Sequence, residues 1–143
     1  MKYALGILKP DCLNNGMKEL VFSILERNGF HVVAEKRFRF KRRDVEIIYE
    51  RCIDADFFEG LSAFLMSGDS VAIIVEDGTE NVIKNLNSVV GHTDPKLAKP
   101  GTVRSFGENI RYNLMHSTMD MNSFLKEARH LFSPEELDKI GFG

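Results

Sequence analysis

His116 is the side chain in this sequence best suited to covalent chemistry. It is one of four histidines, and it closes a short apolar stretch that begins at Tyr112. A neutral imidazole, with a pKa near ~6.5, can act as a nucleophile or a proton carrier once a partner holds one ring nitrogen. Glu127, on the helix expected to follow, is the candidate partner. The alternative for His116 is a surface or structurally satisfied histidine with no chemical role. The alternative for Glu127 is a solvated charge on a helix face.

Three further residues on expected loops could bind an anion. Lys9 ends a buried strand, where a lysine is costly unless it meets an anion or a polar ligand. Arg104 follows Pro100-Gly101-Thr102 in a long loop, and its guanidinium offers two parallel donors to phosphate oxygens. Together with Thr93 it could cradle phosphates. On local evidence, solvation of the loop explains the same residues equally well.

Two aromatic positions are candidates for contacts with a planar ligand. Phe57 stands next to Phe58 at a helix start, and two adjacent rings cannot both face one core. One of them could stack on a base, although a wider apolar helix face is the simpler explanation. Tyr49 fits a core stripe with Val45 and Ile48, but its hydroxyl needs a partner if it is buried. The sequence has no P-loop and no GxGxxG motif, so side chains would have to bind any phosphate.

Length and composition restrict the class of protein. The 143 residues, 43% hydrophobic and 28% charged, predict a single folded domain over residues 1–143. The formal net charge of −2 argues against a dedicated nucleic-acid binder, which is usually strongly basic. The longest apolar run, 71–75, is far too short to cross a bilayer. We therefore expect a protein with no membrane association and no specific nucleic-acid partner.

The cysteines and the first residues indicate the compartment. Cys12 and Cys52 are too few for a disulfide framework, and no cysteine or histidine spacing indicates a metal site. The chain starts with Met1-Lys2-Tyr3 and shows no apolar signal-peptide region. These features favour a cytoplasmic protein in a reducing environment.

The hydrophobic pattern alternates between strand-like and helix-like segments that must position these residues. The expected strands are residues 2–8, 32–40, 71–75 and 112–116. Lys9-Pro10-Asp11 is expected to stop the first strand, and the expected helices start near residues 14–17, 45, 57, 82, 124 and 134. A loop covers 91–104. This order is typical of an α/β (α+β) fold, a ferredoxin-like sandwich in which a four-stranded antiparallel sheet carries helices on one face.

The order and spacing of several short motifs resemble the nucleoside diphosphate kinase family. The likeness runs from about Tyr3 to Phe132, and Tyr49 lies eight residues before Phe57-Phe58. The other matching pieces are Ile7-Leu8-Lys9-Pro10-Asp11, Ser67-Gly68, Gly91-His92-Thr93-Asp94-Pro95, Lys99-Pro100-Gly101-Thr102-Val103-Arg104 and Asn113-Leu114-Met115-His116. Each piece is modest, but their joint order is highly specific.

The resemblance implies an activity and a role for each candidate. The family transfers the γ-phosphoryl group of a nucleoside triphosphate to a nucleoside diphosphate by a ping-pong reaction, and it assembles into hexamers or tetramers. Mg²⁺ would arrive on the nucleotide phosphates. By position, His116 would carry the phosphoryl group and Glu127 would orient it. The nucleotide contacts would come from Phe57 on the base, Lys9 and Asn113 on the ribose, and Tyr49, Thr93 and Arg104 on the phosphates.

Four features depart from the family pattern. Asn87 stands where the family usually has a second phosphate-binding arginine, and Lys84 on the same helix is a candidate substitute. Ser117-Thr118-Met119-Asp120 replaces the Gly-Ser-Asp that usually follows the histidine. The segment between Arg104 and Asn113 is one residue shorter than in most members. The sequence after Phe132 differs from the common ending.

Two alternative functions remain open at this point. The first is a nucleotide-binding, weakly active or regulatory homologue with an altered phosphate site, which Asn87 and Ser117-Thr118-Met119 motivate. The second is a module that binds RNA or a protein through its sheet, for which the only basic cluster is Lys36, Arg37, Arg39, Arg42 and Arg43. The net charge and the lack of paired aromatic residues on a basic strand argue against it.

Overall fold

The computed structural model describes residues 2–142 and is built around a four-stranded sheet. Its strand order is β2-β3-β1-β4, and every neighbouring pair is antiparallel. The strands are β1 (Ala4–Leu8), β2 (His31–Arg39), β3 (Asp69–Glu76) and β4 (Met115–Ser117). The antiparallel sheet predicted from the sequence is therefore present, and the first strand, expected to be buried, lies between β3 and β4.

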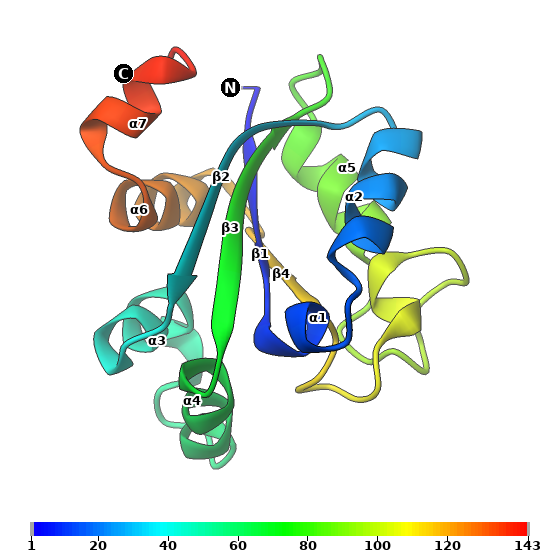
Figure 1. Ribbon diagram of the computed structural model, residues 1–143, viewed down its shortest axis with the longest axis vertical. Coiled ribbons are helices and arrows are strands. Elements are labelled where there is room, and N and C mark those ends of the chain that lie inside the picture. Colours follow the sequence, from blue (N-terminus) through cyan, green and yellow to red (C-terminus); the bar gives the residue numbers. More distant parts are fainter. Residues whose placement is uncertain (1, 143) are drawn as a thin grey trace.

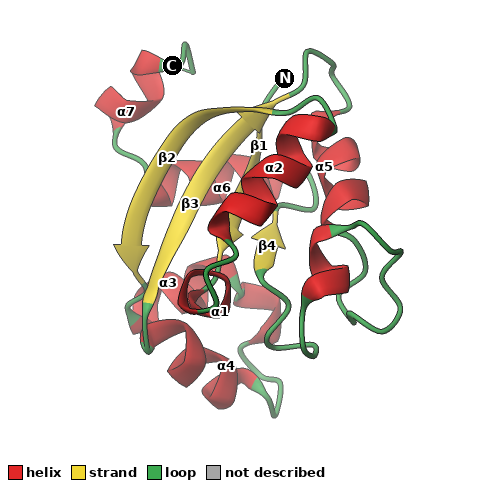
Figure 2. Cartoon of the chain, turned by 45° about the vertical axis from the view of Figure 1, so that its right-hand side comes forward, coloured by secondary structure: helices red, strands yellow, loops and turns green. Residues whose placement is uncertain are grey.

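The helices lie on both faces of this sheet, so the expectation of helices on one face is wrong (Figures 1 and 2). One face carries α1 (Pro10–Asn14), α2 (Lys18–Arg27) and α5 (Val82–Val90). The other carries α3 (Arg42–Ile48), α4 (Phe58–Met66), α6 (Met121–Leu131) and α7 (Pro134–Lys139).

The physical reason for two helical layers is visible in the central strands. In β3, Val71, Ile73 and Val75 belong to the core beneath α2 and α5, whereas Ala72 and Ile74 belong to the opposite core. Successive strand residues point to opposite faces, so a strand without polar positions must be covered twice. The apolar run 71–75 therefore required helices on both sides of the sheet.

Three elements differ from the sequence expectation. Pro10 does not merely end the first strand, because it opens the short helix α1 from the first helical position, where its fixed φ is favourable. The segment after α3 tightens into the 3-10 helix η1 (Glu50–Cys52). The expected strand 112–116 is reduced to β4, because Leu114 has a φ of 77°, which interrupts an extended backbone.

The remaining long segment connects α5 to β4. It includes the 3-10 helix η2 (Val103–Phe106) and runs across the sheet end at which β4 begins (Figure 1). Met1 and Gly143 lie outside the described residues. Within residues 2–142, none of the helices has the length and apolar character needed to cross a membrane.

Candidate active site

The centre of the site is a histidine–glutamate pair contributed by two elements. His116 lies in β4, paired with Ile7 of β1, and Glu127 lies in α6. The two side chains meet at 2.7 Å between Nε2 and Oε1, and both are largely buried. A carboxylate at this distance accepts a hydrogen bond from Nε2–H, and this tautomer leaves the lone pair on Nδ1. Glu127 is therefore not a solvated charge on a helix face, because its carboxylate is buried against the imidazole ring.

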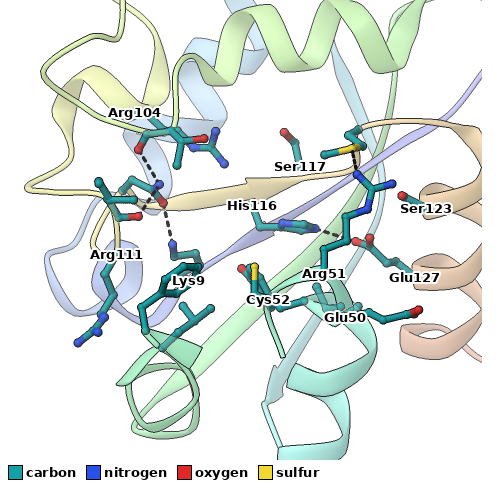
Figure 3. A pocket seen from close by; sticks show the side chains of 18 of the residues that line it. Lys9, Glu50, Arg51, Cys52, Arg104, Arg111, His116, Ser117, Ser123 and Glu127 are labelled. Carbon is teal, nitrogen blue, oxygen red and sulfur yellow. Dashed lines mark hydrogen bonds and ion pairs between the residues drawn. The ribbon is translucent and has the colours of Figure 1, made fainter. Parts of the chain in front are cut away.

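The histidine faces a cavity of about 840 Å³. Of the residues named as candidates from the sequence, nine line this cavity: Lys9, Tyr49, Phe57, Asn87, Thr93, Arg104, Asn113, His116 and Glu127. They come from positions more than one hundred residues apart in the chain. Figure 3 shows Lys9, Arg104, His116 and Glu127 around the same hollow. The structure thus brings together nine of the side chains that sequence reasoning selected, and leaves out only the substitute cation Lys84.

A strained backbone presents His116, and sequence reasoning missed the residue that stabilises it. Leu114 is the only described residue other than glycine with a positive φ, at 77°. Its N–H donates to Oδ2 of Asp11 at 3.0 Å, and its carbonyl accepts from the N–H of Lys9 at 2.9 Å. Burial raises the pKa of Asp11. The Lys-Pro-Asp motif was noted, but nothing in its spacing reveals that Asp11 stabilises a turn over one hundred residues away.

Lys9 is a buried cation at one wall of the cavity. Its Nζ donates to Oδ1 of Asn113 at 2.7 Å, and Asn113 in turn donates to the carbonyls of Thr93 and Ile110, each at 3.0 Å. Desolvation lowers the pKa of Lys9 from 10.5 to about 8; the charge of Asp11 opposes this shift only in part, and the nearby Arg104 adds to it. The cluster presents a lysine whose charge is poorly compensated, which favours an anion or a polar ligand.

Arg104 is fixed by the backbone at the start of η2. Its Nε donates to the carbonyl of Met115 at 3.1 Å and its Nη1 to the carbonyl of Gly91 at 3.0 Å. Desolvation lowers its pKa. These two hydrogen bonds leave part of the guanidinium fork free toward the cavity, beside the residue that precedes His116. Arg104 is therefore not simply a solvated loop residue, because two backbone carbonyls hold its guanidinium.

The two aromatic candidates have different environments. Phe57 is 54% exposed at the cavity, while its neighbour Phe58 is 1% exposed in the core. This settles which of the two rings is free to stack. Tyr49 packs its ring on His116, with centroids 5.2 Å apart. Its hydroxyl is buried without a hydrogen-bond partner among residues 2–142, and burial raises its pKa. A buried orphan hydroxyl beside the histidine is suited to meet a polar group of a ligand.

Asn87 reaches the cavity from α5 as a neutral group. Its Oδ1 accepts from the hydroxyl of Ser117 at 2.6 Å, and its Nδ2 donates to the carbonyl of Thr118 at 3.0 Å. The side chain at Ser117, one of the departures from the family pattern, therefore holds Asn87. Lys84, considered as a substitute cation, does not line this cavity and borders a shallow hollow beside it.

Sequence reasoning also missed other lining residues. Arg51 of η1 and Arg111 border the cavity, and so does Met119, which the sequence singled out only as a departure from the family pattern. Their positions depend on how η1 and the segments before and after β4 fold over the site, and no local pattern in the sequence signals this folding. Within residues 2–142, no cluster of three or more histidine, cysteine or acidic side chains could hold a metal ion.

Comparisons with known proteins agree with this geometry. The family model described as nucleoside diphosphate kinase matches residues 2–137. A nucleoside diphosphate kinase of Wolinella succinogenes is 34% identical over 139 residues, covering 96% of this chain and 100% of that protein. A Helicobacter pylori (strain P12) nucleoside diphosphate kinase is 35% identical over 134 residues, covering 93% and 96%.

A solved structure extends the agreement to three dimensions. The nucleoside diphosphate kinase of Aquifex aeolicus superposes with a TM-score of 0.87 at 29% identity, covering 94% of this chain and 97% of that one. This confirms the ferredoxin-like α/β fold. The relatives are phosphotransferases, and nothing in these likenesses favours the regulatory alternative. The chain belongs to the nucleoside diphosphate kinase family.

Proposed function

We propose that His116 is the phosphoryl carrier of this chain in a ping-pong transfer from a nucleoside triphosphate to a nucleoside diphosphate. The observation that carries the proposal is the 2.7 Å contact between Nε2 of His116 and the buried Glu127. This contact engages Nε2 and leaves the lone pair of the other ring nitrogen, Nδ1, available to attack phosphorus. The cations Lys9 and Arg104 line the same cavity.

The reaction divides into two displacements that mirror each other. In the first, Nδ1 forms a bond to the γ-phosphorus, the bond from that phosphorus to the bridging oxygen breaks, and the nucleoside diphosphate leaves with the electron pair. In the second, a terminal oxygen of another diphosphate attacks the phosphohistidine and the P–N bond breaks. Glu127 stabilises the positive charge that the ring carries during each step. Positioning and charge stabilisation supply most of the acceleration in such transfers.

The proposal assigns the nucleotide contacts as the family resemblance implies, and its support is that all these side chains line one cavity. Phe57 stacks on the base, and every base has a π-face, so the pocket accepts purines and pyrimidines. Lys9 and Asn113 bind the ribose hydroxyls. Tyr49, Thr93 and Arg104 hold the phosphates, with the neutral Asn87 at the α5 side. Mg²⁺ enters on the phosphate oxygens as part of the substrate, since it usually keeps several waters and substrate phosphates as ligands.

The proposal includes the setting of the enzyme. Residues 1–143 form a single domain around one sheet. The chain assembles into a homo-oligomer, a hexamer or a tetramer, and works in the cytoplasm, where the free thiols of Cys12 and Cys52 remain reduced.

A labelling experiment tests the carrier. The protein is mixed with γ-labelled ATP and Mg²⁺, and we expect an acid-labile, base-stable phosphate on the protein that moves to unlabelled GDP, UDP and CDP. His116→Ala should abolish labelling, while the matched variant His31→Ala, in the exposed start of β2, should label like the parent chain. Label retained in His116→Ala would assign the carrier to another residue.

A further inference from the structure

Arg51 is a cation at the cavity whose interactions within the chain are weak. It lies in η1, two residues after Tyr49, and its side chain is 69% exposed. Its Nη1 contacts the sulfur of Met119, and its Nη2 lies 3.8 Å from Oδ2 of Asp120. A thioether is a poor acceptor, and 3.8 Å is too long for a hydrogen bond. The guanidinium therefore gives up little when it changes partners.

The other cations around the histidine are partly or fully engaged within the chain, and Arg111, which also lines the cavity, lies beyond Lys9 and away from His116 (Figure 3). Lys9 is hydrogen-bonded to Asn113, and Arg104 to two backbone carbonyls. Lys126 pairs with Glu50 at 3.1 Å, which also neutralises the acidic neighbour of Arg51. Most of the donor capacity of Arg51 remains available, and an arginine fork matches phosphate oxygens in pairs.

The location of Arg51 complements the other two cations. In Figure 3, Lys9 and Arg104 lie on one side of His116, and Arg51 lies on the other side, beside Ser117 and Glu127. The α5 wall contributes only the neutral Asn87, which Ser117 holds in place. A phosphoryl group moving onto His116 would thus have fixed positive charge on one side only, unless Arg51 supplies it on the other.

We infer that Arg51 is a catalytic residue that leaves Met119 and Asp120 to bind the transferring phosphoryl group. This inference rests on the proposed function, since it assigns a contact to the same phosphohistidine site. Charge spreads over the equatorial oxygens of a phosphoryl group in transfer, and a guanidinium aimed at them lowers the barrier. η1 carries Arg51 next to Tyr49, so the 3-10 turn couples this cation to the ring that packs on His116.

The test compares three variants of the full chain. Arg51→Gln removes the charge, Arg51→Lys keeps it without the fork, and Arg37→Gln removes an exposed β2 arginine that pairs with Asp69 at 2.9 Å outside the cavity. The readouts are the single-turnover rate of protein labelling from γ-labelled ATP with Mg²⁺ and the Kd for ADP. We expect labelling to slow about 10- to 100-fold in Arg51→Gln, partial recovery in Arg51→Lys, and no change in Arg37→Gln.

The outcomes separate the two proposals. If the parent chain labels and Arg51→Gln labels equally fast, the role of Arg51 is overturned while the histidine carrier stands. Equal slowing in Arg37→Gln would also overturn it, because the effect would then be one of net charge. A parent chain that never labels on His116 contradicts the proposed function itself. If a weaker affinity for ADP accounts for all of the slowing, the inference is overturned as well, because Arg51 would then bind only the ground-state nucleotide.

Discussion

Lys9 is the residue whose ionisation should control how activity depends on pH. Its pKa in the folded chain is lowered from 10.5 to about 8 by desolvation, so the free enzyme loses this charge as pH rises through about 8. We expect kcat/KM for a nucleoside diphosphate to fall above that pH, because the anionic nucleotide then enters a cavity that has lost one positive charge. A pH profile from 6.5 to 10 measures it, with Lys9→Arg as the variant that keeps its charge.

The same shift has a second, independent consequence for stability. Between about pH 8 and 10.5 the unfolded chain binds a proton at Lys9 that the folded chain does not. The contribution of this group to the free energy of unfolding therefore rises with pH across that window. Urea unfolding of Lys9→Met should lack this rise. A flat kcat/KM profile, together with an unchanged stability slope, would contradict the burial of a titrating Lys9.

Sequence reasoning could select the candidate reacting residues and the partner Glu127, but not the other groups that hold the site in place. His116, Glu127 and Arg104 carry recognisable chemistry within recognisable motifs. Asp11 acts through a hydrogen bond to Leu114, and Arg51 reaches the cavity because η1 turns toward Met119. Both depend on contacts between segments distant in the chain, which no local periodicity encodes. Tertiary contacts also decided that Phe57, rather than Phe58, remains exposed.

At the scale of elements, the apolar periodicities located the strands and most helices, and the errors have identifiable causes. The prediction that Pro10 only ends the first strand overlooked the preference of proline for the first helical turn. Pro10 in fact begins α1. The helix start expected near residue 134 is confirmed, and a capping box forms it, since the hydroxyl of Ser133 accepts from the N–H of Glu136. Placing helices on one face neglected that β1 and β3 have no polar side to leave in solvent.

Gly91 links α5 to the loop that carries Arg104, and we expect Gly91→Ala to loosen both. The residue has φ 95° and ψ −178°, a conformation that only glycine adopts readily. A Cβ there would lie 2.6 Å from Oγ1 of Thr102, and the Gly91 carbonyl accepts from Arg104. The variant should lose about 1–3 kcal/mol of stability and show a raised KM, measured by urea unfolding and steady-state kinetics.

Gly78→Ala is the matched control for that experiment. Gly78 also has a positive φ, 81°, but an added Cβ meets nothing within 4 Å, and the residue lies outside the cavity. It should lose stability through backbone strain alone and keep its KM. If the two variants affect KM equally, the connection between Gly91 and the position of Arg104 is wrong.

At the scale of the whole molecule, one segment, the loop between α5 and β4, both lines the cavity and exposes apolar side chains on the surface. The loop between α5 and β4 supplies Thr93 and Arg104 to the cavity, and it also exposes Leu97, Phe106 and Ile110, with Leu97 66% exposed. Apolar side chains gathered on one surface segment are typical of contact regions between subunits. Assembly would then immobilise a loop that binds phosphate, so oligomeric state and activity should change together.

Leu97→Asp tests that coupling. A charge placed in a subunit contact is costly to desolvate, so we expect the variant to sediment as a smaller species than the parent and to show a higher KM for nucleoside diphosphates. Leu97→Met, which conserves volume and apolarity, should behave like the parent. Sedimentation velocity at matched micromolar concentrations gives the mass relative to the 16.3 kDa chain. A parent that sediments as a monomer with full activity would contradict both the assembly and its proposed role in fixing the phosphate-binding loop.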